Sequence, residues 1–187
     1  MSWTIFKLEL ASKMENPNWD SVEDYADFFV KKYDECVKRG FDIITKNTVL
    51  KGNTELMKST LILALMQGTN SKSEEFYNQS LALYGKAIIC YWLGVELGKI
   101  PPLIPAPGTI LNLSVVSNTV INPGVWMEVP IPILPSTTVN TFLEIIVLAA
   151  KIHLTTISGI CNTISQYPPT APPGPGILAW QGYTIIE

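Results

Sequence analysis

Apolar residues in the first half of the chain recur at every third or fourth position, which is the spacing of a helix with one buried face. This pattern predicts helices over residues 2–14, 21–38 and 54–67, followed by a fourth that begins within 71–75 and ends near residue 97. The fourth becomes apolar on nearly every side toward its end, which is typical of a central, buried helix. The first half therefore predicts a helical body.

Small and polar residues mark the ends and breaks of these helices. Residues 18–21 supply side-chain oxygens that can cap the second helix, and Gly68 ends the third. Gly85 and Gly94 lower helix propensity inside the fourth helix by about 1 kcal/mol each relative to alanine. These two glycines indicate either a close approach between helices or a local break.

Prolines change the pattern in the second half. The run PPLIPAPG at 101–108 excludes helix, because proline lacks the amide donor and forces the residue before it into extended geometry. Apolar and polar residues then alternate from residue 109 to 133 around a turn at 122–124, which predicts a β-hairpin. Pro130 and Pro132 confine its second strand to a sheet edge or to an extension without ladder bonds.

A long apolar stretch follows over residues 137–166 and predicts a second helical segment. Its length raises the possibility of a membrane span. However, Glu144, Lys151 and His153 would each cost several kcal/mol in lipid without a partner, roughly 3 by insertion scales. Burial within a subunit or between subunits is the better interpretation, and a membrane-associated helical protein is the alternative.

The last segment, 167–187, begins with a proline-rich spacer and ends in apolar and aromatic residues. Such a stiff spacer is suited to an extended docking tail. The predicted fold class is therefore mainly α with a small β-hairpin, a helical body with extended proline-rich arms. One domain with extensions is expected: a body at 1–99, a proline-bounded hairpin segment at 100–136, a long helix at 137–166 and the docking tail.

Charge is distributed very unevenly. All but four of the charged side chains lie in residues 1–99, and the exceptions are Glu128, Glu144, Lys151 and Glu187. Ordinary domains devote about a quarter of their residues to charge, so much of the second half should be covered by protein. The net charge of −3 and the scattered basic residues offer no stripe for nucleic acid. The partners expected are copies of the same chain and neighbouring subunits.

Candidate chemistry is sparse. His153 is the single histidine, and an apolar helix usually holds such a residue for structural reasons. Cys36, Cys90 and Cys161 are widely separated, without the clustered spacing of a metal site or a disulfide scaffold. We expect no catalysis, no metal and no cofactor. A small enzyme or ligand-binding module that pairs His153 with one of the cysteines is a further alternative.

Four motifs together carry a family resemblance: PPLIPAPG at 101–108, NPGVW at 122–126, HLTTISG at 153–159, and PPGPG followed by WQGY within 172–183. With these motifs the chain resembles small virion structural proteins of tailed phages, especially the T4-like phages of marine cyanobacteria. The resemblance runs along most of the chain. It implies a repeated subunit of a capsid, neck, tail or baseplate, made in the host cytoplasm and located in the virion.

The sequence thus predicts an assembly protein that binds itself and other virion proteins through apolar surface. Aromatic residues dominate interface energies, and prolines mark the predicted edge. The alternative for each candidate is packing within its own subunit. A deletion of 167–187 is expected to break assembly and to leave the body folded. The candidate interface residues are Trp126, Pro130, Pro132, Tyr167, Trp180 and Tyr183.

Overall fold

The computed structural model of the chain describes residues 2–15, 20–44, 46–68, 74–98, 112–127, 138–166 and 174–186. The helices within these ranges are α1 (Trp3–Glu15), α2 (Val22–Val37), α3 (Thr54–Gly68), α4 (Glu74–Trp92) and α5 (Val139–Thr156). The strands are β1 (Gly40–Asp42), β2 (Thr48–Lys51), β3 (Glu96–Gly98), β4 (Asn112–Asn122), β5 (Ser158–Gln166), β6 (Gly174–Gln181) and β7 (Tyr183–Ile185).

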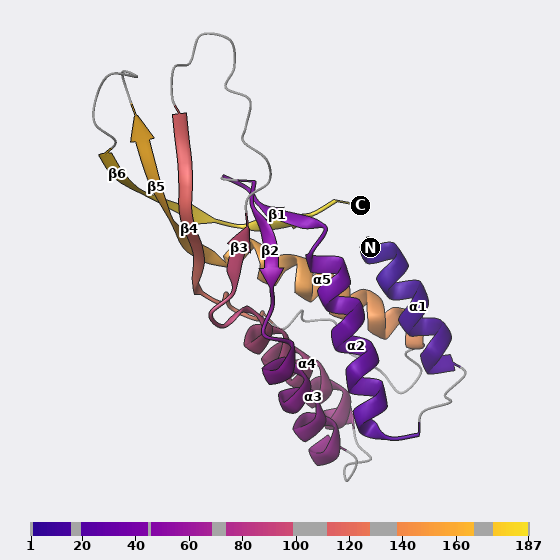
Figure 1. Cartoon of the computed structure of the whole chain (residues 1–187). Coiled ribbons are helices and arrows are strands. Elements are labelled where there is room, and N and C mark those ends of the chain that lie inside the picture. Colours follow the sequence, from indigo (N-terminus) through magenta and orange to yellow (C-terminus); the bar gives the residue numbers. More distant parts are fainter. Residues whose placement is uncertain are drawn as a thin grey trace.

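The predicted helices of the first half are confirmed, and their caps follow from local chemistry. Ser21 caps α2, since its hydroxyl accepts a hydrogen bond from the backbone N–H of Asp24 at 3.1 Å. Glu23 and Asp24 add negative charge to the first turn, where the helix dipole favours it. In the body, α3 packs along α2 and α4, and α1 packs along α5 (Figure 1).

The two glycines predicted inside the fourth helix have different roles. Gly94 marks the expected break, whereas the close approach at Gly85 comes from a tryptophan ring and not from a helix. Gly85 lies directly against the Trp126 ring, so that a Cβ atom at this position would overlap the indole. Gly94 has a φ of +69° and follows the end of α4, which is Trp92 instead of residue 97. Because glycine adopts positive φ without steric cost, the chain reverses here and continues into β3.

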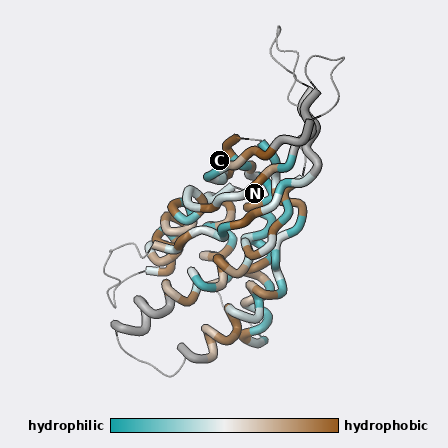
Figure 2. The backbone as a smooth tube through the Cα atoms, turned by 90° about the vertical axis from the view of Figure 1, so that its left-hand side faces the viewer, coloured by the Kyte–Doolittle hydropathy of each residue, from teal (hydrophilic) through white to brown (hydrophobic). Residues whose placement is uncertain are grey.

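The strands form an antiparallel sheet in the order β2-β3-β4-β5-β6, and β1 pairs separately with β7. The longest ladder joins β4 to β5 and contains irregularities between Val115 and Ser117 and between Val120 and Asn122. Beside it, β6 pairs with β5 from Gly174 to Gln181. The far ends of β4, β5 and β6 project beyond the helical body (Figure 1). In the view turned by 90°, the helices lie below the sheet (Figure 2).

The β content corrects the predicted fold class. The predicted helical body is present, but the chain combines it with an extensive antiparallel sheet, so the fold is not mainly α with only a small hairpin. The first strand of that hairpin exists as β4, and its partners among the described strands are β3 and β5. Residues 123–127 form no regular element, and 128–137 lie outside the described residues.

The predicted long helix is confirmed only to Thr156. The prediction is wrong for 158–166, which form β5. Local preference already disfavours helix here, since Thr155, Thr156 and Ile157 are β-branched and Gly159 follows them. Pairing on both edges, with β4 and β6, then makes β5 the central strand of the projecting part. The proline-rich segments at 100–111 and 167–173 lie outside the described residues.

An aromatic core joins the helices to the C-terminal strands. The Trp92 indole N–H donates to the Tyr33 hydroxyl at 3.0 Å, and the Tyr183 ring packs against Trp92 with centroids 5.0 Å apart. The Tyr183 hydroxyl in turn donates to the Val37 carbonyl at 2.8 Å. Each ring thereby buries its apolar body and satisfies its polar end. The core ties β7 to α2 and α4.

Candidate functional site

The projecting strands β4, β5 and β6 present two unlike faces. Side chains alternate between the faces of a sheet. One set includes Asn118, Cys161 and Trp180, which are almost fully buried, although Leu178 on the same face is 37% exposed. The alternate set includes Ile177, with 77% of its surface exposed, and the exposed residue Ala179. We call this second set the open face; its members are Thr119, Ser158, Ile160, Asn162, Ile177, Ala179 and Gln181.

The three strands contain no aspartate, glutamate, lysine or arginine. Their exposed polar groups are hydroxyls and amides, as in the hydrogen bond from the Asn162 amide to the Ser117 hydroxyl at 2.8 Å. Next to the open face, Ile121 on β4 is 61% exposed. The ladder brings one charged residue to the margin of this face, the exposed Glu96 of β3 opposite Thr119. An exposed surface with so little charge is unusual for a protein that stays separate from others. This is the feature of the structure that best fits an interaction site.

The buried face is anchored by a polar network. The Trp180 indole N–H donates to the Asn118 side-chain oxygen at 2.6 Å, and the Asn118 amide donates to the Asp42 carboxylate at 3.4 Å. That carboxylate also accepts the backbone N–H groups of Ile44 and Asn47, at 3.1 and 2.9 Å. Asp42 therefore links β1 and the turn after it to β4 and, through Asn118, to β6.

The structure separates the six candidate interface residues. Trp180 and Tyr183 are each 2% exposed, so they pack within their own chain, the alternative considered for each candidate. Trp126 is half-buried against α4 and α5. Pro130, Pro132 and Tyr167 lie outside the described residues. Asp42 and Asn118 were not identified from the sequence as buried polar residues. Asn118 is two positions from Val120 and so lies on the same face of the strand, and a polar residue on an apolar face is a signal of a buried hydrogen bond.

His153 fastens the segment after β4 to the end of α5. Its Nε2 atom lies 2.8 Å from the Pro123 carbonyl oxygen, which can only accept, so Nε2 carries the proton. The Thr156 hydroxyl accepts the backbone N–H of Val125 at 2.8 Å. Gly124 fits between them with a φ of +86°, and a Cβ atom there would lie 2.8 Å from both His153 Nε2 and the Thr156 hydroxyl. This arrangement positions Trp126 against Gly85.

Burial lowers the pKa of His153 to about 4, opposed only partly by the hydrogen bond to Pro123. The imidazole is therefore neutral at pH 7. Its Nδ1 atom and the Trp126 indole nitrogen are both buried without a hydrogen-bond partner in the described part of the chain. Neither ring nitrogen of His153 bonds to a cysteine. The geometry gives this histidine a structural role and does not assemble a Cys–His pair.

Between pH 6.5 and pH 4, we expect the free energy of unfolding of the native protein to fall by about 3 kcal/mol more than that of a His153→Gln variant. The folded pKa lies below the unfolded value of 6.5, so the unfolded state binds the proton more readily as the pH falls through this window. Glutamine retains an amide that can donate to Pro123 but does not titrate. Urea midpoints at pH 4, 5, 6 and 7 measure the difference, and parallel profiles for the two proteins would contradict it.

The described residues show no cluster of metal-binding side chains, and two of the three thiols are buried. No group of three or more histidine, cysteine, aspartate or glutamate side chains there could hold a metal ion. The thiols of Cys36 and Cys161 are buried, and burial raises the pKa of Cys161. A raised pKa keeps a thiol protonated and unreactive.

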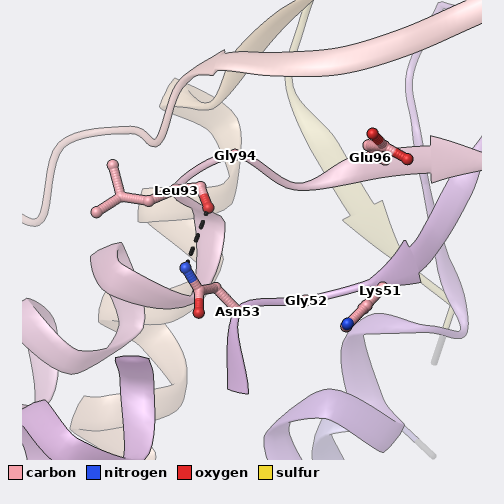
Figure 3. Close-up of a pocket in the computed structure, with 6 residues that line it drawn as sticks. All are labelled: Lys51, Gly52, Asn53, Leu93, Gly94 and Glu96. Atoms are coloured by element: carbon pink, nitrogen blue, oxygen red, sulfur yellow. Dashed lines mark hydrogen bonds between the residues drawn. The ribbon is translucent and has the colours of Figure 1, made fainter. Parts of the chain in front are cut away.

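A pocket of about 380 Å³ lies where β2 meets α3 and α4 meets β3. The Asn53 side-chain amide, between β2 and α3, donates a hydrogen bond to the Leu93 carbonyl, between α4 and β3, at 3.4 Å (Figure 3). Lys51 and Glu96 are exposed and point away from each other (Figure 3). The pocket therefore lacks convergent groups that would define a ligand. Its lining residues are Lys51, Gly52, Asn53, Leu93, Gly94 and Glu96.

Among the described helices, α5 is long and apolar enough to cross a membrane by length and composition. One face of it is buried against the rest of the chain, with Phe142 packing on Tyr84 at a centroid distance of 5.9 Å. On the other side, Glu144 forms an ion pair with Lys7 of α1 at 2.8 Å. A core helix of a globular protein passes the same test, so α5 adds no separate support for the membrane alternative.

Comparison of the chain with protein-family models, curated proteins and solved structures finds no match.

Proposed function

We propose that this protein is a structural subunit of a larger protein assembly, in which the β4–β5–β6 part is covered by other protein. The observation that carries the proposal is the open face, which lies on the projecting strands and has no charged residue. Burial of exposed apolar residues such as Ile121 and Ile177 would drive association. Hydroxyl and amide groups around them can be paired across an interface at little cost.

We propose further that the assembly is a virus particle of the tailed-phage type. Support for this step is the motif resemblance along the chain, together with an architecture that joins a helical body to projecting strands. A virion subunit needs surfaces that remain covered once assembled, and uncharged surface suits such permanent contacts. The role requires neither a catalytic centre nor a cofactor.

The native mass of the purified full-length chain tests the assembly proposal. We expect light scattering coupled to gel filtration, in buffer without detergent, to give a discrete multiple of the 20.7 kDa chain or larger particles. Ile121→Lys should lower that mass, because it places a charge beside the open face. Leu63→Lys on α3, where the native residue is equally exposed at 62%, is the matched control and should leave the mass unchanged.

A monomer at all concentrations tested would contradict self-association. An equal loss of mass with both lysine variants would contradict the assignment to the open face. For the virion proposal, the chain should be found by mass spectrometry in purified particles from cells that produce it. Its absence from such particles, with the protein present in the cell extract, would overturn that step.

A further inference from the structure

We infer that the outer edge of β6 pairs antiparallel with the β6 edge of a second copy of this chain, so that the two sheets become continuous across a two-fold axis. This inference rests on the proposed function, because it names one contact of the proposed assembly. It concerns the strand edge and its backbone groups, a surface distinct from the side chains of the open face.

The orientation of the β6 backbone follows from one hydrogen bond. Gly182 N–H donates to the Ile157 carbonyl at 2.8 Å, which places these two residues at a hydrogen-bonded position of the antiparallel ladder. Such positions alternate with positions whose N–H and C=O groups point away from the partner strand. From the register of β5 and β6, the backbone groups of Ile177, Ala179 and Gln181 therefore point outward.

Pro175 agrees with this orientation. It lies opposite Ile164, at a position of the same outward-pointing set. Proline has no N–H, so it is tolerated in a strand where that group would not face a partner. The inner ladder to β5 thus loses nothing at Pro175. Among the described residues, no strand pairs with the outer edge of β6.

The two edges of the sheet differ in how they resist pairing. The β2 edge is four residues long and ends in Lys51, and a short, charged edge discourages the addition of another strand. In contrast, β6 has eight residues and no charge, and its outward-facing Pro175, a residue that discourages pairing, lies outside residues 177–181. In a two-fold contact each strand faces its own sequence, so any charge would meet a like charge nearby. The absence of charge makes β6 compatible with a second copy of itself.

The outward-pointing set also defines a register. Ala179 is the middle residue of Ile177, Ala179 and Gln181, and a pairing centred on it makes Ala179 face its own counterpart and Ile177 face Gln181 of the second copy. All three side chains lie on the open face, where Ala179 is small and Ile177 is 77% exposed. The contact therefore requires no rearrangement of the buried Trp180.

Cysteine cross-linking of the full-length chain tests both the edge and the register. Cys36 and Cys161 are buried, and Cys90→Ala removes the remaining, partly exposed thiol. In this background we expect Ala179→Cys to form a covalent dimer with a short bismaleimide. Gln181→Cys alone is the matched control on the same strand, because its two copies would lie about 13 Å apart along the pair. A mixture of Ile177→Cys and Gln181→Cys chains should cross-link.

Each outcome decides the inference. Cross-linking at Ala179 and in the mixture, without cross-linking of Gln181→Cys alone, supports it. Equal cross-linking of all the single variants would overturn the register and the edge pairing, since it would reflect random encounters. A discrete oligomer with no cross-link at any of the three positions would overturn the edge pairing and leave the proposed function standing. A monomeric protein would overturn both.

Discussion

A chain that ends at Gln166 is expected to lose cooperative folding. The removed segment contributes β6 and β7 together with the buried rings of Trp180 and Tyr183. Loss of one large buried aromatic side chain costs about 3–5 kcal/mol, and whole domains are stable by only about 5–15 kcal/mol. Removal of both rings and of the pairing to β5 and β1 therefore exhausts the stability of the fold. Urea unfolding followed by near-ultraviolet circular dichroism measures the change.

The control is a chain that ends at Ile185, which retains both strands and loses the exposed Ile186 and the residue after it. It should unfold with nearly the native midpoint. The sequence led to a different expectation, that the body stays folded without 167–187. A cooperative unfolding transition in the chain that ends at Gln166 would contradict this prediction. It would support the sequence-based interpretation of residues 167–187 as a separate docking tail.

Replacement of Asp42 by alanine is expected to destabilise the protein by roughly 3–5 kcal/mol. Its buried carboxylate accepts hydrogen bonds from the Asn118 amide and from the backbone N–H groups of Ile44 and Asn47. Hydrogen bonds to charged groups contribute about 1.5–3 kcal/mol each, and buried donors left without an acceptor add a desolvation penalty. The urea midpoint should fall without a change in the slope of the transition.

Asp27→Ala provides the matched control. Asp27 is also in an ion pair, with Lys58 at 2.7 Å, but 59% of its side chain is exposed. A surface pair of this kind contributes about 0–1 kcal/mol, so this variant should remain close to native stability. Asp42→Asn should lie between the two, because an amide retains one oxygen acceptor. A cost for Asp42→Ala no greater than that for Asp27→Ala would show that the network does not hold β1 to the sheet.

The candidate site could be predicted from the sequence only in its general character. The scarcity of charge in the second half led to the prediction that much of its surface is covered by protein, and the structure places exposed, uncharged residues on β4, β5 and β6. The sequence did not show which individual residues are exposed on this surface. An aromatic residue such as Trp180 can serve equally as a core residue or an interface anchor, and only its position in three dimensions separates the two.

The sequence by itself determined the helices of the first half and most of their ends, because amphipathic spacing and the Ser21 cap act within a few residues of each other. The exception is α4, which ends at Trp92 and not near residue 97. Only the tertiary structure decided the sheet. Strand β4 pairs with β5 some forty residues later, and β7 pairs with β1, which lies in the first quarter of the chain. Local sequence cannot specify such pairing, since a strand is stabilised by neighbours that are distant along the chain. The same dependence on distant contacts buried Trp180 and Tyr183 and left the outer edge of β6 without a paired strand among the described residues.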